Sequence, residues 1–145
     1  IYRIMKKIKT ILSIFAIALI PALVSCDEDR KYVDVEYEYQ LMPGTHQDIT
    51  GTVSYVDING NMVSGGSVSK YPFVVSFEAE KGFDNVKMVV TLNPLSEGVS
   101  LPIQVNQRYS LELEDIERES TITNTFQTVQ EYNTFCATPQ VFEIK

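Results

Sequence analysis

The sequence predicts a single all-β domain, an antiparallel sandwich of about seven short strands, behind a cleaved N-terminal segment. Three observations carry this prediction. Apolar and polar residues alternate with a period of two along most of the chain after residue 31, turn residues recur about every 8–15 residues, and no long helical pattern competes. With 145 residues, of which 44% are hydrophobic and 21% charged, the chain has room for one core and needs no disulfide or metal to fold.

Residues 1–25 are predicted to be a targeting segment and not part of the fold. They hold four of the 12 basic residues, none of the 19 acidic ones, and an apolar run over residues 11–24. That run suits the core of a signal peptide, because a membrane-spanning helix needs about 20 apolar residues and a buried core helix would show a polar face. Met5, followed by Lys6 and Lys7, reads as the true start, which makes residues 1–4 upstream sequence.

The end of the apolar run, Leu23-Val24-Ser25-Cys26, resembles the lipobox of bacterial lipoproteins. The resemblance implies that the signal is cleaved between Ser25 and Cys26 and that the Cys26 thiol carries diacylglycerol. A thiolate is the nucleophile that such an alkylation needs. Two or three acyl chains would hold the protein on a membrane almost permanently.

After cleavage the mature chain would keep 8 basic and 19 acidic side chains, a net charge of −11. Such an acidic chain is repelled by phosphate backbones, so nucleic acid is excluded as a partner. Residues 26–31 are predicted to be an acidic tether. Its Asp27-Glu28-Asp29 run resembles the surface-export signal of Bacteroidota lipoproteins, whereas an Asp directly after the Cys signals inner-membrane retention in enterobacteria. The expected location is the cell envelope, at the outer membrane and exposed on the cell surface.

The sandwich domain is predicted to span residues 32–136, and its first half contains three strands. Residues 31–41 alternate apolar with acidic side chains, which is typical of a strand with one face in the core. Residues 49–58 and 71–79 alternate in the same way. Between these two strands, Asn59-Gly60 supplies the positive φ angles of a tight hairpin turn.

The second half of the domain repeats the alternation. Strands are predicted over residues 86–92, 99–105 and 109–113, followed by a Thr-rich strand over residues 121–135. Residues 137–145 either add a final strand through residues 141–144 or form a loose tail.

Two short motifs resemble known sites, and in both cases a structural interpretation is favoured. Asp57-Ile58-Asn59-Gly60-Asn61 opens like a calcium-binding loop, but Met62 and Val68 replace the required Gly and Glu, so a hairpin turn is expected. Ser67-Val68-Ser69-Lys70 matches the nucleophile motif of penicillin-recognising enzymes. It follows two glycines and does not open a helix, so a loop is expected.

The remaining candidate residues are few. His46, the only histidine, lies in a loop and is expected to be exposed, and no His-rich metal site or catalytic relay can form without it. Carboxylates cluster at Glu112, Glu114, Asp115, Glu117 and Glu119, where a solvated face is expected that could bind a cation loosely or meet a basic partner. Because lipidation would consume Cys26, Cys136 is either a small buried hydrophobe or a thiol that pairs with another chain. Tyr71 and Tyr132 are candidates for stacking on sugars, with packing in the core as the alternative.

Residues 33–73 resemble a second family, the small β-sandwich proteins known from the mycobacterial membrane protein small (MmpS) group. The resemblance rests on Val35-Glu36-Tyr37-Glu38-Tyr39, on Val53-Ser54-Tyr55-Val56-Asp57-Ile58-Asn59-Gly60 and on Tyr71-Pro72-Phe73. The cysteine pair of that family is missing here. The resemblance implies an immunoglobulin-like sandwich that acts as an accessory to membrane export.

Two functional hypotheses follow. The first is a lipid-anchored, non-enzymatic envelope lipoprotein whose sandwich binds a protein or glycan, with no cofactor, metal or catalytic residue. The alternative is a small envelope hydrolase that uses the surface carboxylates Glu112, Glu114 and Asp115. The first is favoured, because the sequence shows no pairing of a nucleophile with a base.

Overall fold

The computed structural model describes residues 31–145. The predictions made for the signal segment and tether, at Leu23, Ser25, Cys26, Asp27, Glu28 and Asp29, lie outside the described residues. Within residues 31–145, no helix is long and apolar enough to span a membrane.

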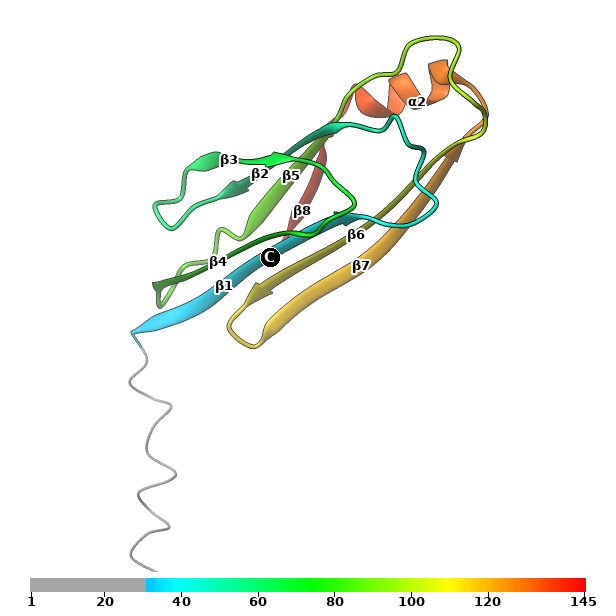
Figure 1. Cartoon of the computed structure of the whole chain (residues 1–145). Helices are drawn as coiled ribbons and strands as arrows, with labels where there is room; N and C mark the ends of the chain where they lie inside the picture. Colours follow the sequence, from blue (N-terminus) through cyan, green and yellow to red (C-terminus); the bar gives the residue numbers. More distant parts are fainter. Residues whose placement is uncertain (1–30) are drawn as a thin grey trace, which may run out of the picture. The chain divides into compact units, whose positions relative to one another are not determined.

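Two four-stranded antiparallel sheets pack face to face, which confirms the predicted all-β sandwich (Figure 1). The strand order is β4-β1-β6-β7 in one sheet and β3-β2-β5-β8 in the other. In chain order the elements are β1 (Tyr32–Leu41), β2 (Gly51–Val56), β3 (Met62–Ser67), β4 (Phe73–Glu80), β5 (Lys87–Leu92), β6 (Ile103–Leu113), β7 (Ile116–Phe126), α2 (Val129–Cys136) and β8 (Gln140–Glu143).

β1 shows how the alternating sequence makes this fold. Its odd-numbered residues from Val33 to Leu41 are all buried in the core, whereas its even-numbered residues face outward. β4 pairs with one edge of β1 and β6 with the other, so that Tyr37 lies between Val75 and Leu111. Since side chains alternate across a pleated strand, these pairings carry one apolar face and one polar face across three strands.

The core contains one buried polar side chain among the described residues, Gln107 of β6. Its amide oxygen accepts a hydrogen bond of 2.8 Å from the Tyr39 hydroxyl, and its amide nitrogen donates to the side-chain oxygen of Gln140. Because the oxygen and the nitrogen of the Gln107 amide are both hydrogen-bonded, this polar side chain can be buried between the sheets. The buried Gln107 also explains why β6 was predicted as two strands, over residues 99–105 and 109–113. The structure has one strand, Ile103–Leu113, and residues 99–102 lie before it and are not part of a strand.

The hairpin turn expected at Asn59-Gly60 is confirmed. Gly60 has a φ of +78°, and the Asp57 carboxylate accepts hydrogen bonds of 2.9 Å from the backbone N–H groups of Asn59 and Asn61. The turn leads into β3, which the sequence analysis missed because its Gly65 and Gly66 are rare in strands. A side chain on Gly65 would lie 2.5 Å from the ring of Phe73, so glycine is required there for close packing.

The predicted strand over residues 121–135 is wrong in its second half. β7 ends at Phe126, and α2 begins after Thr128, whose hydroxyl accepts a hydrogen bond from the Glu131 N–H. The Glu131 carboxylate in turn accepts from the N–H groups of Gln127 and Thr128, at 2.8 and 3.2 Å. This capping box satisfies N–H groups that the first helical turn leaves unpaired and so starts a helix in a Thr-rich segment.

The open question about residues 137–145 is answered by β8. Gln140–Glu143 pairs with β5 and completes the second sheet, and Phe142 and Ile144 are buried. The Phe142 ring stacks on Tyr109 of β6 at a centroid distance of 4.1 Å. The described fold therefore has eight strands, not seven, and its final strand belongs to the core.

Candidate functional site: an acidic sheet face

The outer surface of the first sheet carries most of its charge at one end. We call this surface the acidic face. It is made of the outward-facing carboxylates of four strands, Asp34, Glu36, Glu38, Glu78, Glu80, Glu112, Glu117 and Glu119.

Strand register places these carboxylates opposite one another. Glu36 of β1 is paired with Glu112 of β6, and Glu112 is paired with Glu117 of β7, so three glutamates form a row across three strands. Asp34 is paired with Glu78 of β4. Directly opposed side chains have Cβ atoms about 4.5–5.5 Å apart, and like charges at this distance repel. The row therefore costs stability unless cations gather near it.

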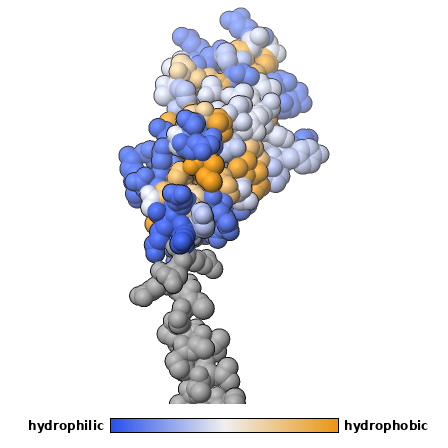
Figure 2. All heavy atoms as spheres, turned by 90° about the vertical axis from the view of Figure 1, so that its left-hand side faces the viewer, coloured by the Kyte–Doolittle hydropathy of each residue, from blue (hydrophilic) through white to orange (hydrophobic). Residues whose placement is uncertain are grey.

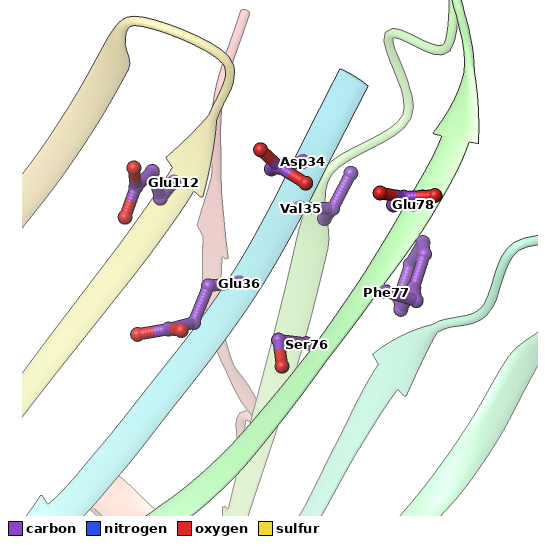
Figure 3. A pocket seen from close by; sticks show the side chains of 7 residues that line it. All are labelled: Asp34, Val35, Glu36, Ser76, Phe77, Glu78 and Glu112. Atoms are coloured by element: carbon purple, nitrogen blue, oxygen red, sulfur yellow. The ribbon is translucent and has the colours of Figure 1, made fainter. Parts of the chain in front are cut away.

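A shallow depression of about 310 Å³ lies within the acidic face. Figure 3 shows Glu36 and Glu112 on neighbouring strands, with Asp34, Glu78 and Ser76 beside them. Val35 and Phe77 also line the depression. The site has four carboxylates and no basic side chain in its lining, so its chemistry favours positively charged groups.

Arg108 is the basic side chain that balances part of this charge. Its Nε donates to the Glu119 carboxylate at 2.7 Å, and a terminal nitrogen lies 3.7 Å from Glu38. The hydrogen bond and the charge of Glu119, with that of Glu38, raise the pKa of Arg108 above its usual range. Arg108 thus serves Glu119 and Glu38, whereas the row of Glu36, Glu112 and Glu117 is paired with no arginine or lysine among residues 31–145.

The structure divides the five carboxylates singled out from the sequence. Glu112, Glu117 and Glu119 belong to the acidic face, whereas Glu114 and Asp115 form the turn between β6 and β7, where Glu114 has a φ of 55°. All five are exposed, as expected for a solvated face. The sequence analysis missed the contribution of β1 and β4, because alternation along one strand does not say which strands lie beside it.

His46 is not exposed as expected: its side chain is 7% accessible. Its Nε2 lies 2.9 Å from the Ser100 hydroxyl, and the Asp48 carboxylate is 3.8 Å from Nδ1. These three residues resemble a Ser-His-Asp relay, but their hydrogen bonds run in the opposite direction. The Asp48 backbone N–H lies 3.3 Å from Nδ1, in position to donate to it, which favours the tautomer with the ring proton on Nε2. In that tautomer Nε2 donates to Ser100 and does not withdraw its proton.

Cys136 combines features of its two predicted alternatives. It is a free thiol at the end of α2, half-buried, and its Sγ lies 3.7 Å from the Asn93 carbonyl oxygen. Burial raises the pKa of the thiol, and a hydrogen bond with Tyr132 opposes that rise. A protonated thiol is a poor nucleophile, so this position favours a structural role.

The two tyrosines considered for sugar stacking have opposite environments. Tyr71 is 75% exposed in the loop before β4, where its ring is free to contact a ligand. Tyr132 is completely buried, and its hydroxyl donates to the Asn93 carbonyl at 3.0 Å. Tyr132 is therefore a core residue, which confirms the alternative of core packing, and its ring is not available to stack on a sugar.

Apolar side chains also reach the surface. Figure 2 shows them between groups of hydrophilic residues, on the side of the molecule where β1 begins. Exposed large hydrophobic residues of the β2–β3 hairpin include Ile58 and Met62, which are 53% and 47% accessible. Among the described residues, no three His, Cys, Asp or Glu side chains are arranged to hold a metal ion.

Comparison of the chain with protein-family models, with curated proteins and with solved structures finds no match. The resemblances to lipoproteins and to the MmpS group therefore stay predictions from the sequence motifs.

Proposed function

We propose that this protein is a lipid-anchored lipoprotein of the cell envelope whose β-sandwich binds another protein or a glycan without catalysing a reaction. The observation that carries the proposal is the order of the N-terminal sequence: a basic cluster, an apolar run, and then Leu23-Val24-Ser25-Cys26. We expect the anchored protein to be held at the outer membrane and displayed on the cell surface.

The residue at which the fold begins is consistent with cleavage before Cys26. β1 begins at Tyr32, six residues after Cys26, and the described core is built from residues between Val33 and Ile144. Cleavage before Cys26 would leave this core complete. A six-residue tether spans at most about 20 Å, so the sandwich would stay close to the bilayer surface.

The acidic face and Tyr71 support a binding role over the hydrolase alternative. A glycosidase needs one carboxylic acid whose pKa is raised by an apolar environment, within a cleft that holds the sugar. Glu112, Glu114 and Asp115 are all exposed to solvent at a hairpin. An exposed face of negative charge instead attracts a partner with positive charge and speeds their encounter.

The anchor is tested by growing cells with an alkyne fatty acid and comparing wild type with Cys26→Ala. We expect the label on the wild-type protein and its loss in the variant. A Cys136→Ala variant is the matched control and should keep the label. Label that persists in Cys26→Ala would refute lipidation at this residue.

The binding role is tested by cross-linking in intact cells, followed by purification of the products. We compare wild type with the triple variant Glu36→Gln, Glu112→Gln and Glu117→Gln, and with Tyr71→Ala. Loss of one defined product in the triple variant would indicate a basic protein partner, whereas a glycan-array signal lost in Tyr71→Ala would indicate a sugar. Products unchanged in both variants, together with blank arrays, would contradict the proposal.

A further inference from the structure

β7 is the outermost strand of its sheet, and its free edge is long and regular (Figure 1). It has 11 residues, contains no Gly or Pro, and pairs with β6 along its whole length without a bulge. Among the described residues, its backbone bonds to no strand other than β6. Since every second residue of such a strand turns both its N–H and its C=O away from the neighbour, β7 presents a row of unpaired backbone groups.

The other three edges are shorter or less regular than the edge of β7. β3 contains Gly65 and Gly66 and a register shift against β2, which bends the edge. β8 has four residues, and the carbonyl of its Glu143 accepts a hydrogen bond of 2.8 Å from Arg118. β4 has eight residues and can overlap an antiparallel copy of itself over seven of them, so its edge is shorter than that of β7.

We propose that the β7 edge pairs antiparallel with β7 of a second copy of this chain and joins two sandwiches into a dimer with a continuous eight-stranded sheet. The inference is independent of the proposed function. Two copies of an 11-residue strand can overlap along their whole length, with the two side chains of each opposed pair on the same face of the sheet. The two-fold axis then passes midway between the two copies of Thr121, and each residue faces the residue of the second copy that lies equally far from Thr121 in the opposite direction along the strand.

This register is self-complementary. Ile116, which is 54% exposed in the single chain, would face Phe126 of the second copy at each end of the interface. Apolar pairs of this kind, and Thr opposite Thr at the centre, are favourable in antiparallel sheets.

Charge also favours the antiparallel pairing of two copies. The three charged residues of β7 are Glu117, Arg118 and Glu119, all in its first half, whereas Ser120–Phe126 carries no charge. In the proposed register they face Thr125, Asn124 and Thr123 of the second copy. The acidic end of each sandwich thus lies beside the uncharged end of the other, and no like charges are opposed.

Disulfide trapping of the full chain tests the register. Thr121→Cys, made in a Cys136→Ser background, places two thiols opposite each other, so mild oxidation should give a product of twice the chain mass that the Cys136→Ser protein alone does not give. Thr125→Cys is the matched control on the same strand and face. In the proposed register Thr125 of one copy lies opposite Glu117 of the other, which is eight residues from the second Thr125. The two thiols would therefore lie about 26 Å apart.

Charge substitution at Thr123 tests the stability of the dimer. Its dissociation constant is measured by sedimentation of the detergent-solubilised full chain. Thr123→Lys faces Glu119 of the second copy and should tighten the dimer, whereas Thr123→Glu should weaken it, each by roughly 2- to 30-fold because the pair occurs twice. Thr123 is exposed in the single chain, so at concentrations where the protein is monomeric both variants should melt like wild type.

Four results would overturn the proposal. The first three are a Thr121→Cys protein that stays monomeric on oxidation, equal trapping of Thr121→Cys and Thr125→Cys, and a monomer–dimer equilibrium that neither Thr123 substitution shifts. A Thr121→Cys product that joins the chain to a different protein would also overturn it, since the edge would then pair with a foreign strand.

Discussion

The two ends of the sandwich are built on opposite principles. At the end covered by α2, polar groups are paired and apolar side chains are enclosed: Tyr132 packs edge-to-face on Phe126 at 5.6 Å, and Asn133 bonds both the N–H and the C=O of Leu95 (Figure 1). At the acidic face, like charges are opposed on neighbouring strands in the open. The comparison teaches that the contacts that stabilise the fold lie at one end, whereas the opposed charges that cost stability lie at the other, where we propose that a partner binds.

The largest effect is expected at the covered end. Tyr132→Ala should lower the free energy of unfolding by about 3–5 kcal/mol, because it removes a fully buried ring and leaves a cavity. Urea denaturation measures this loss. Tyr71→Ala, at a 75% exposed ring, is the control and should change stability by about 0.5 kcal/mol or less. Equal losses in the two variants would contradict the comparison.

The aromatic interior beneath the acidic face should make the protein sensitive to alkali. Burial raises the pKa of Tyr37 to about 12 from its ordinary value of 10.0. Because the folded state holds this proton more tightly than the unfolded state, the contribution is complete below pH 10 and is lost between pH 10 and 12, by about 1.4 kcal/mol per pH unit. Unfolding titrations in this range should show a shallower decline for Tyr37→Phe, and an identical decline would argue against a buried hydroxyl.

The loop that joins β5 to β6 should depend on one amide in α2. Asn133→Ala removes its two bonds to the Leu95 backbone, at 2.8 and 2.9 Å, and should cost about 1–2 kcal/mol. Asn133→Asp keeps the acceptor for the Leu95 N–H but turns its second oxygen towards the Leu95 carbonyl, where two acceptors repel, so thermal unfolding should show a loss for this variant too. If Asn133→Asp were as stable as wild type, the paired-amide explanation would fail.

The smallest effect should have the opposite sign and occur at the acidic face. Glu112→Gln removes the central charge of its row and should stabilise the fold by about 0.5 kcal/mol at low salt. The gain should disappear near 1 M salt, where the screening length is about 3 Å. Glu97→Gln makes the same charge change at an exposed loop position and serves as the control. A gain of equal size at Glu97 would point to net charge, not to the opposed glutamates.

The fold was predictable where local patterns report burial directly. The alternation of residues 31–41 predicts β1, because its five core side chains are apolar without exception. β6 was divided in the prediction since its buried Gln107 is polar, and only the tertiary partners Tyr39 and Gln140 make that burial favourable. α2 was missed although Thr128 and Glu131 have the spacing of a capping box, because the surrounding Thr-rich sequence favours a strand.

The acidic face was predictable only in part. Each strand shows where its carboxylates face outward, but the row of Glu36, Glu112 and Glu117 exists because β6 lies between β1 and β7. That strand order is set by the packing of the whole sandwich and not by any single segment. For the same reason, the sequence did not predict that β7 lies at the edge of its sheet.

The measurement that tests the account most directly is the intact mass of the native polypeptide purified from membranes. We expect a chain that begins at Cys26 and carries the added mass of a diacylglycerol group on that residue. A polypeptide that retains residues 5–25 and an unmodified Cys26 would contradict the account.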